Sequence, residues 1–360
     1  MRSKIFTSII VAFAFTALGA PDNYDAILPV RGFCIAAPRP KGVDRFVKFI
    51  DTALAPRHVN TLVLRVDYNF QYKGHPEVAD GDSLSLADVK KLVAMCRKDN
   101  IRLIPEIDLL GHQSYRTNIG GLLRAHPEFD ETPWIKVPGY CRSYCPLHPQ
   151  VHDVVFSVMD ELCDAFECDA FHAGMDEVFY IGESQCPRCA GHNPAELFAG
   201  EVAAIHDHLQ SRGRQMWMWG DRLLDSKAAG VGKWEASEAG TAPAIDLIPK
   251  DVMICDWHYE SAVPTPAYFA IKGFHVIMCP WKKASVAVDE ADDMVRWRSR
   301  VAPELREHFE GVMQTVWSSA ERFLDNDYGV SEGTNSWNCF TAMSSEIKKL
   351  VKKPVGTMRK

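Results

Sequence analysis

Two adjacent carboxylates, Asp176 and Glu177, are the residues of this sequence best placed to do chemistry. They directly follow the apolar run 170–174 and precede the apolar and aromatic residues 178–180, which leaves little room for a solvated turn. Carboxyl groups held in such surroundings exchange protons with a bound molecule. The pair therefore predicts a catalytic centre that works by acid–base chemistry.

The elements that must position this pair are short apolar runs rich in branched residues, which alternate with segments of helical spacing. The runs cover residues 32–36, 60–66, 101–107, 170–174, 215–219, 252–257, 275–279 and 312–317. Helical spacing is clear over 43–54, 86–98, 151–166 and 196–211. This alternation predicts an α/β fold, a single-domain (β/α)8 TIM barrel, with a doubly wound open sheet as the alternative.

In such a barrel the functional side chains project from the carboxyl ends of the strands. Polar and aromatic residues gather at these ends here, except that Arg31 stands at the start of the first strand. The candidate binding residues are Arg31, Asp67, His112, His172, Trp219, Trp257, Tyr259, Trp281 and Trp317. Because aromatic faces stack on sugar rings and charged groups bind hydroxyls, the combination favours a carbohydrate ligand. A long segment over 110–149 is expected to form an ordered cover over the site.

Adjacency limits what Asp176 and Glu177 can do to a sugar. Glycosidases that use two carboxylates place them on opposite sides of the scissile bond, about 5 to 9.5 Å apart. Neighbours in sequence do not easily flank a bond in that way. They fit a mechanism in which one carboxyl group donates a proton and the other orients a nucleophile that belongs to the substrate.

The motifs of the chain resemble those of glycoside hydrolase family 20, the β-N-acetylhexosaminidases. The strand end 172–177 reads His-Ala-Gly-Met-Asp-Glu and is similar to the family's fourth-strand motif. Residues 105–112 resemble the third-strand motif, with Leu110 where the family usually has a proline, and Arg31-Gly32 resembles the opening of the first strand. The resemblance extends over roughly residues 30–325.

This resemblance implies a retaining exo-β-N-acetylhexosaminidase that needs no cofactor and acts on glycans with a terminal β-linked GlcNAc or GalNAc. Glu177 would protonate the glycosidic oxygen and later activate water, while Asp176 would hold the 2-acetamido group for attack on the anomeric carbon. The other roles it implies are sugar binding by Arg31, a supporting relay of Asp67 and His112, and an acetamido pocket walled by Trp219, Trp257 and Trp317.

Two departures from the family pattern keep alternatives open. Residues 280–283 read Pro-Trp-Lys-Lys where the family has a Tyr and an Asp, so Tyr259 is expected to replace the missing acetamido donor. Ser319 stands where an acid is usual. One alternative is a non-catalytic sugar-binding barrel. The other is a metal-dependent barrel hydrolase using Asp108, His112, His172 and Asp176, although the sequence has no His-x-His pair after its first strand.

Residues 1–20 have the layout of a secretory signal peptide, with two basic residues, an apolar run over 5–18 and small residues at 19 and 20. We therefore expect a secreted or periplasmic protein whose barrel occupies 21–360, with no N-terminal accessory domain and no membrane span after cleavage. A net charge of -7 without a basic stripe disfavours nucleic acid as a partner.

Two local pairs stand out among the eleven cysteines, Cys141 with Cys145 and Cys186 with Cys189. Export favours disulfides. Four thiolates from two loops could instead hold a structural zinc, and free thiols are the third possibility.

Overall fold

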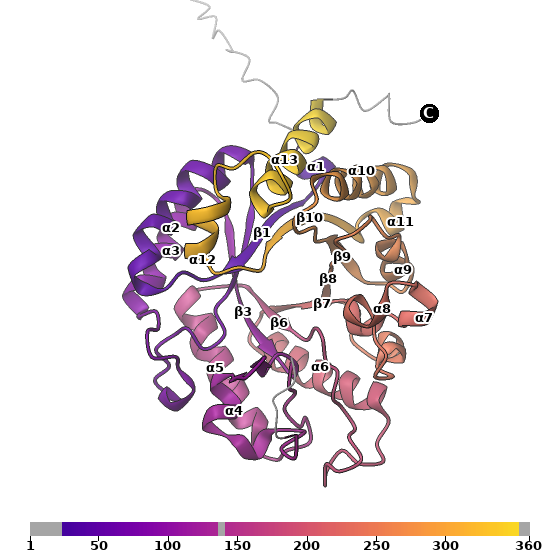
Figure 1. Cartoon of the computed structure of the whole chain (residues 1–360). Coiled ribbons are helices and arrows are strands. Elements are labelled where there is room, and N and C mark those ends of the chain that lie inside the picture. The colour runs from indigo at the N-terminus through magenta and orange to yellow at the C-terminus, as the bar shows by residue number, and fades with distance from the viewer. Residues whose placement is uncertain (1–23, 136–140, 353–360) are drawn as a thin grey trace, which may run out of the picture.

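The computed structural model describes residues 24–135 and 141–352. Eight parallel strands close into a barrel in the order β1-β10-β9-β8-β7-β6-β3-β2 (Figure 1). They are β1 (Val30–Ala36), β2 (Thr61–Arg65), β3 (Arg102–Leu109), β6 (Ala170–Gly174), β7 (Gln215–Trp219), β8 (Met253–Asp256), β9 (His275–Met278) and β10 (Phe309–Val316). The predicted (β/α)8 barrel is confirmed, and the open-sheet alternative is wrong because β1 pairs with both β2 and β10.

Helices surround the barrel on its outside (Figure 1). The longer ones are α3 (Leu86–Lys98), α5 (Val151–Phe166), α6 (Pro194–Ser211), α10 (Ala284–Arg300) and α13 (Ser336–Lys352). The shorter ones are α1 (Tyr24–Ile27), α2 (Val43–Phe49), α4 (Gly121–Ala125), α7 (Ser226–Ala229), α8 (Gly232–Glu235), α9 (Thr265–Ile271), α11 (Pro303–Arg306) and α12 (Ala320–Arg322). Local chemistry sets their starts: Ser85 and Asp88 form a capping box on α3, and Asn193 caps α6.

Alternating side chains of the strands fill two separate cores. On β1, Phe33 packs outward against Phe49 and Phe340 on the surrounding helices. Its neighbour Cys34 belongs to a second cluster made of every other residue along several strands, such as Trp217 and Trp219. Because successive side chains of a strand point to opposite faces, this second cluster is the packed interior of the barrel. Side chains therefore fill the interior of the barrel, and a ligand can reach the barrel only at the carboxyl ends of its strands.

The segment after β3 forms a cover at that end of the barrel. It contains a two-stranded hairpin, β4 (Ser114–Tyr115) and β5 (Asn118–Ile119), and the helix α4. A partly buried Arg142–Asp130 ion pair at 2.6 Å and a hydrogen bond from the Tyr144 N–H to the Leu110 carbonyl fix its two halves. The expected ordered cover is present in the described parts of this segment.

Residues 1–20, where the sequence predicts a signal peptide, lie outside the described residues. Within the described ranges, none of the helices has both the length and the apolar composition needed to cross a membrane.

Candidate active site

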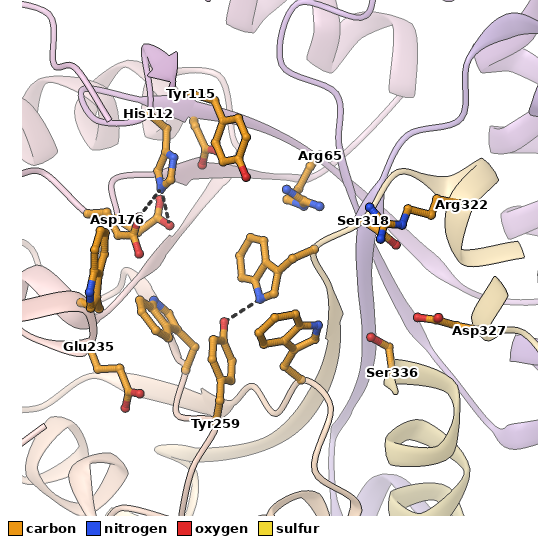
Figure 2. A pocket seen from close by; sticks show the side chains of 16 residues that line it. Arg65, His112, Tyr115, Asp176, Glu235, Tyr259, Ser318, Arg322, Asp327 and Ser336 are labelled. Carbon is orange, nitrogen blue, oxygen red and sulfur yellow. Dashed lines mark hydrogen bonds and ion pairs between the residues drawn. The ribbon is translucent and has the colours of Figure 1, made fainter. Parts of the chain in front are cut away.

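A pocket of about 780 Å³ opens at the carboxyl end of the barrel (Figure 2). Its walls combine carboxylates, cations and aromatic rings. The carboxylates are Asp108, Asp176, Glu177, Glu235 and Asp327, the cationic residues are Arg65, His112 and Arg322, and the aromatic residues are Tyr115, Trp234, Trp257, Tyr259, Trp281 and Trp317. Of the residues that the sequence predicts for the site, His112, Asp176, Glu177, Trp257, Tyr259, Trp281 and Trp317 line this pocket.

Asp176 and Glu177 meet at one imidazole nitrogen. His112 Nε2 lies 3.1 Å from Asp176 Oδ2 and 3.3 Å from Glu177 Oε2, as the dashed lines of Figure 2 mark. Burial lowers the pKa of His112, but the charge of Asp176 and hydrogen bonds to its neighbours outweigh burial and raise it well above its ordinary value. The imidazole is therefore a cation between the two acids, and both approach it from the same side of the pocket.

An unusual backbone path places the two acids at the pocket. Gly174, Met175 and Glu177 have left-handed φ angles of 65°, 72° and 48°. A Cβ on Gly174 would lie 2.3 Å from Asp108 Oδ1, so only glycine fits at this approach. The Glu177 N–H donates to Asp221 Oδ2 at 3.0 Å, and Arg222 Nε donates to the same oxygen at 2.6 Å. Asp221 thus holds the loop in place, a role that the sequence pattern did not indicate.

Cys141 reaches Glu177 from the cover segment. Its thiol donates to Glu177 Oε2 at 3.3 Å, and its sulfur lies 3.4 Å from His112 Nδ1. The grouping of Cys141 with Cys145, Cys186 and Cys189 is therefore wrong, because the backbone turns Cys141 toward Glu177 instead. Sequence reasoning missed this contact, since Cys141 and Glu177 lie on different segments of the chain.

Aromatic residues after β8, β9 and β10 form one wall of the pocket. Trp317 Nε1 donates to the Tyr259 hydroxyl at 2.7 Å, the bond that Figure 2 marks at Tyr259. The Tyr259 ring stacks with Trp257 at a centroid distance of 5.0 Å and meets Trp281 edge-on at 5.3 Å. Burial raises the pKa of Tyr259 well above its ordinary value, so the phenol keeps its proton. With Trp317 as donor to its oxygen, the Tyr259 hydroxyl still has a proton to donate.

Trp219 and His172 do not line the pocket, which corrects their predicted role in substrate binding. Both are fully buried beneath it, with ring centroids 4.5 Å apart. Trp219 Nε1 donates to Glu106 Oε1 at 3.0 Å. Burial lowers the pKa of His172 to about 3, so this histidine is neutral. Both side chains lie inside the packed barrel because the two residues belong to the strands themselves and do not follow them. They pack beneath the residues that line the pocket.

Arg31 lies at the amino end of β1, opposite the pocket, so its predicted contact with sugar is wrong. Its guanidinium contacts Asp25 Oδ1 at 2.8 Å and donates to the carbonyls of Leu28 at 2.7 Å and His58 at 2.8 Å. Among the arginines that do line the pocket is Arg65, the last residue of β2. Arg65 lies next to the end of the predicted run 60–66, which is the sequence signal that could have identified it.

Arg65 is fixed against the aromatic wall. Its guanidinium carbon lies 4.6 Å from the centroid of the Trp317 ring, and Nη2 donates to the Val316 carbonyl at 2.9 Å. Figure 2 shows Arg65 facing the pocket between His112 and Ser318. A planar cation held in this way can bind the hydroxyl groups of a ligand.

Asp67 does not line the pocket either. Its Oδ1 instead accepts the Asp108 N–H at 3.0 Å, which fixes the end of β3. Burial and the nearby charge of Asp108 raise the pKa of Asp67 to about 6. Burial and the charge of Asp176 raise the pKa of Asp108 to about 6 as well. Asp67 and Asp108 therefore titrate in the weakly acidic range.

Metal ligation is possible at three groups among the described residues. One consists of His112, Cys141 and Glu177 in the pocket, and the others are His75, Glu77 and His126 on the surface and a buried cluster of three cysteines with Glu131. The predicted set Asp108, His112, His172 and Asp176 does not converge in the described part of the chain. His172 is sealed beneath the pocket, which removes the geometric basis of that metal-dependent alternative.

A parallel (β/α)8 barrel with paired acids and an aromatic wall at its carboxyl end is the architecture of a glycoside hydrolase. The chain belongs to glycosyl hydrolase family 20: the model of that family's catalytic domain matches residues 66–327. The expected family resemblance is confirmed.

Curated relatives and solved structures agree with this assignment. The chain is 33% identical to a beta-hexosaminidase of Akkermansia muciniphila over 108 residues, which are 28% of this chain and 21% of that protein. It is 24% identical to a beta-hexosaminidase of Vibrio furnissii, covering 61% of this chain and 32% of that one. A solved beta-N-acetylhexosaminidase of Bacteroides fragilis shares the fold at a TM-score of 0.61 and 17% identity, over 89% of this chain and 66% of that one. The chain thus spans less than half the length of these curated relatives.

Proposed function

We propose that the chain is a retaining exo-β-N-acetylhexosaminidase, which removes terminal β-linked GlcNAc or GalNAc from glycans with help from the substrate's own 2-acetamido group. The observation that carries this proposal is the meeting of Asp176 and Glu177 at one nitrogen of His112, within 3.3 Å. Two carboxylates on the same side of a pocket do not flank a scissile bond. One of them is then left to steer a nucleophile that the substrate brings.

Asp176 has an oxygen ready for this role. Its Oδ2 contacts His112, whereas its Oδ1 is buried and has no hydrogen-bond partner among the described residues. An unsatisfied buried acceptor costs free energy, which a donor from the ligand recovers. The N–H of a 2-acetamido group is such a donor. Binding it to Asp176 Oδ1 turns the acetamido carbonyl oxygen toward the anomeric carbon.

Tyr259 completes the acetamido pocket. Its hydroxyl accepts from Trp317 and keeps its own proton, which can be donated to the acetamido oxygen as that oxygen attacks. Trp257 and Trp317 give the methyl group an apolar surface. Tyr259 thereby takes over the donor position that residues 280–283 do not supply.

Glu177 is the proton donor to the leaving sugar and afterwards the base that activates water. Its Oε2 lies beside the Cys141 thiol and His112, so two hydrogen-bonding groups orient the carboxyl group toward the pocket. Arg65, held against the Trp317 ring, binds hydroxyl groups of the terminal sugar. The enzyme is proposed to act outside the cytoplasm, because residues 1–20 have the pattern of a secretory signal.

The test is hydrolysis of aryl N-acetyl-β-hexosaminides. We expect turnover by the wild type, inhibition by a thiazoline analogue of the acetamido intermediate, and no turnover of the matching aryl β-glucoside, which has a 2-hydroxyl. Glu177→Gln should lower kcat/KM by about 100- to 10,000-fold. The exposed Glu304→Gln on α11 should leave kcat/KM unchanged.

The alternatives give different results in the same assay. Binding of N-acetylhexosamine by calorimetry without turnover of any of these substrates would identify a non-catalytic sugar-binding barrel. Turnover that is unaffected by the thiazoline and is lost on chelation from a still folded protein would identify a metal-dependent hydrolase.

A further inference from the structure

Three cysteine thiols and one carboxylate meet in the interior of the protein, away from the pocket. We call this group the loop clamp, and its members are Glu131, Cys145, Cys186 and Cys189. All four residues are buried, at most 2% exposed, and their ligand atoms lie within 4.8 Å of one another. We propose that the loop clamp binds a structural zinc ion.

The distances within the loop clamp match a tetrahedral sulfur site. Cys145 Sγ lies 3.3 Å from Cys189 Sγ and 3.7 Å from Cys186 Sγ. Zinc–sulfur bonds of about 2.3 Å in a tetrahedron put two sulfurs about 3.8 Å apart. A disulfide between any two of these three cysteines would leave the third thiol unpaired. A single metal ion uses all three.

Glu131 is the second and independent observation. Its Oε1 accepts the Glu183 N–H at 3.1 Å, whereas its Oε2 is buried and has no hydrogen-bond partner among the described residues. No cationic side chain in the described part of the chain forms an ion pair with it. A buried carboxylate is normally paired or bound to a metal. The Glu131 carboxylate beside the three thiols provides the fourth ligand of a Cys3Glu site.

The local backbone at Cys186 and Cys189 has the form of a metal-binding turn. The sequence Cys186-Pro187-Arg188-Cys189 brings two sulfurs together within one turn, and the Cys189 N–H points at Cys186 Sγ at 3.5 Å. Hydrogen bonds from backbone N–H groups to a coordinated thiolate stabilise its charge and orient it. Thiolate-rich, closed four-ligand sites favour zinc over oxygen-preferring cations such as Mg²⁺.

The position of the loop clamp connects the metal to the active site. Glu131 and Cys145 belong to the cover segment after β3, and Cys186 and Cys189 belong to the loop after β6. The first segment also carries Cys141 and the second carries Glu177, which are in contact. Zinc would thus tie together the two segments that bring the acid and its hydrogen-bond donor to the pocket, without touching substrate.

Metal analysis of the full chain, purified without added metal or a metal-binding tag, tests the proposal. We expect one zinc ion to be lost in Cys186→Ser and in Glu131→Gln compared with the wild type. Cys168→Ser and Cys141→Ser, which change cysteines outside the loop clamp, should keep that ion. Zinc-free wild type refilled with cobalt should show the charge-transfer and d–d absorption bands of a tetrahedral thiolate site, so the test does not depend on the folding of a variant.

Three results would overturn the proposal. The first is a wild type that holds no zinc and gives no thiolate–cobalt bands. The second is a Cys186→Ser variant that keeps the ion. The third is a disulfide between any two of Cys145, Cys186 and Cys189, found by mass spectrometry of the unreduced protein. None of these depends on glycoside hydrolysis, so the zinc proposal and the proposed activity stand or fall separately.

Discussion

His112 Nε2 lies 3.1 Å from Asp176 Oδ2, and the pair joins the cover segment to the loop after β6. The nearby carboxylates raise the pKa of His112 well above its ordinary value, so the contact is an ion pair at neutral pH. The stabilisation is fully present below the unfolded-state pKa of about 6.5 and is lost as pH rises through the higher folded-state value. The pair therefore contributes both to stability and to the alignment of the acids.

Replacing this cation tests its contribution. We expect His112→Asn to lower kcat/KM by about 100-fold, because it removes a charge beside both acids. The difference in Tm between wild type and variant should shrink as the buffer pH is raised from 6 into the alkaline range. Thermal melts over that range measure it, and a difference that grows with pH would contradict the ion pair.

Replacing Arg65 and Arg31 one at a time separates the contribution to substrate binding from the contribution to folding stability. Arg65→Met should lower kcat/KM by about 10- to 100-fold, since it removes charged hydrogen bonds to sugar hydroxyls, each contributing about 1.5–3 kcal/mol. Arg31→Met should leave kcat/KM unchanged but lower the free energy of unfolding by about 2 kcal/mol, because its partners at the amino end are left without a donor. Steady-state kinetics and urea unfolding of both variants measure these two effects. Equal kinetic losses would show that Arg31 also acts on the site.

Tyr259→Phe removes a hydroxyl group and leaves the ring. We expect kcat to fall by about 100-fold, because the developing charge on the acetamido oxygen loses its donor. Tyr268 is a partly exposed tyrosine on α9, and Tyr268→Phe is the matched control with wild-type kinetics. An aryl substrate with a good leaving group should show the loss too, since that donor acts on the nucleophile rather than on the leaving group.

The raised pKa of Asp67 gives a pH-dependent prediction. An acid whose folded pKa is about 6 binds a proton more tightly when folded, so its stabilising contribution is present below the unfolded pKa of 3.8 and is lost as pH rises through 6. Asp67→Asn keeps the acceptor for the Asp108 N–H and removes the charge. Relative to the wild type, the variant should gain on the order of 2 kcal/mol between pH 4 and pH 8. Unfolding at the two pH values measures the gain, and no change would contradict it.

Gly174→Ala tests the backbone path behind the acids. The left-handed φ and the contact with Asp108 together predict a loss of about 3 kcal/mol in unfolding free energy and of most activity. Gly200 lies within α6 with open space around it, so Gly200→Ala should stabilise the chain by up to about 1 kcal/mol. If both variants melted alike, the special geometry at Gly174 would be refuted.

Strand positions and the place of Asp176 and Glu177 in the pocket could be predicted because they depend on local features. The apolar runs differ from the observed strands by at most a few residues at either end, and the run 215–219 coincides with β7, since side-chain alternation and burial act over a few residues. Asp176 and Glu177 were identified for the same reason, because the apolar residues on both sides exclude a solvated turn.

Depth along each strand could not be predicted. Trp219 and Trp257 both end apolar runs, but Trp219 is the last residue of β7 and is sealed inside, whereas Trp257 follows the last residue of β8 and reaches the pocket. A shift of one or a few residues along the strand decides whether such a side chain lies inside the barrel or lines the pocket. No pattern in the sequence resolves a difference this small.

By itself, the sequence determined the barrel, its eight strands and the adjacency of the two acids, because hydrophobic periodicity and chain neighbourhood are local properties. Only the tertiary structure decided that His112 binds Asp176, that Cys141 turns to Glu177 and that Glu131 joins three cysteines. Those contacts connect segments that are distant in the chain. Closure of the barrel and the folding of its loops bring them together, and burial then fixes which groups must find a partner.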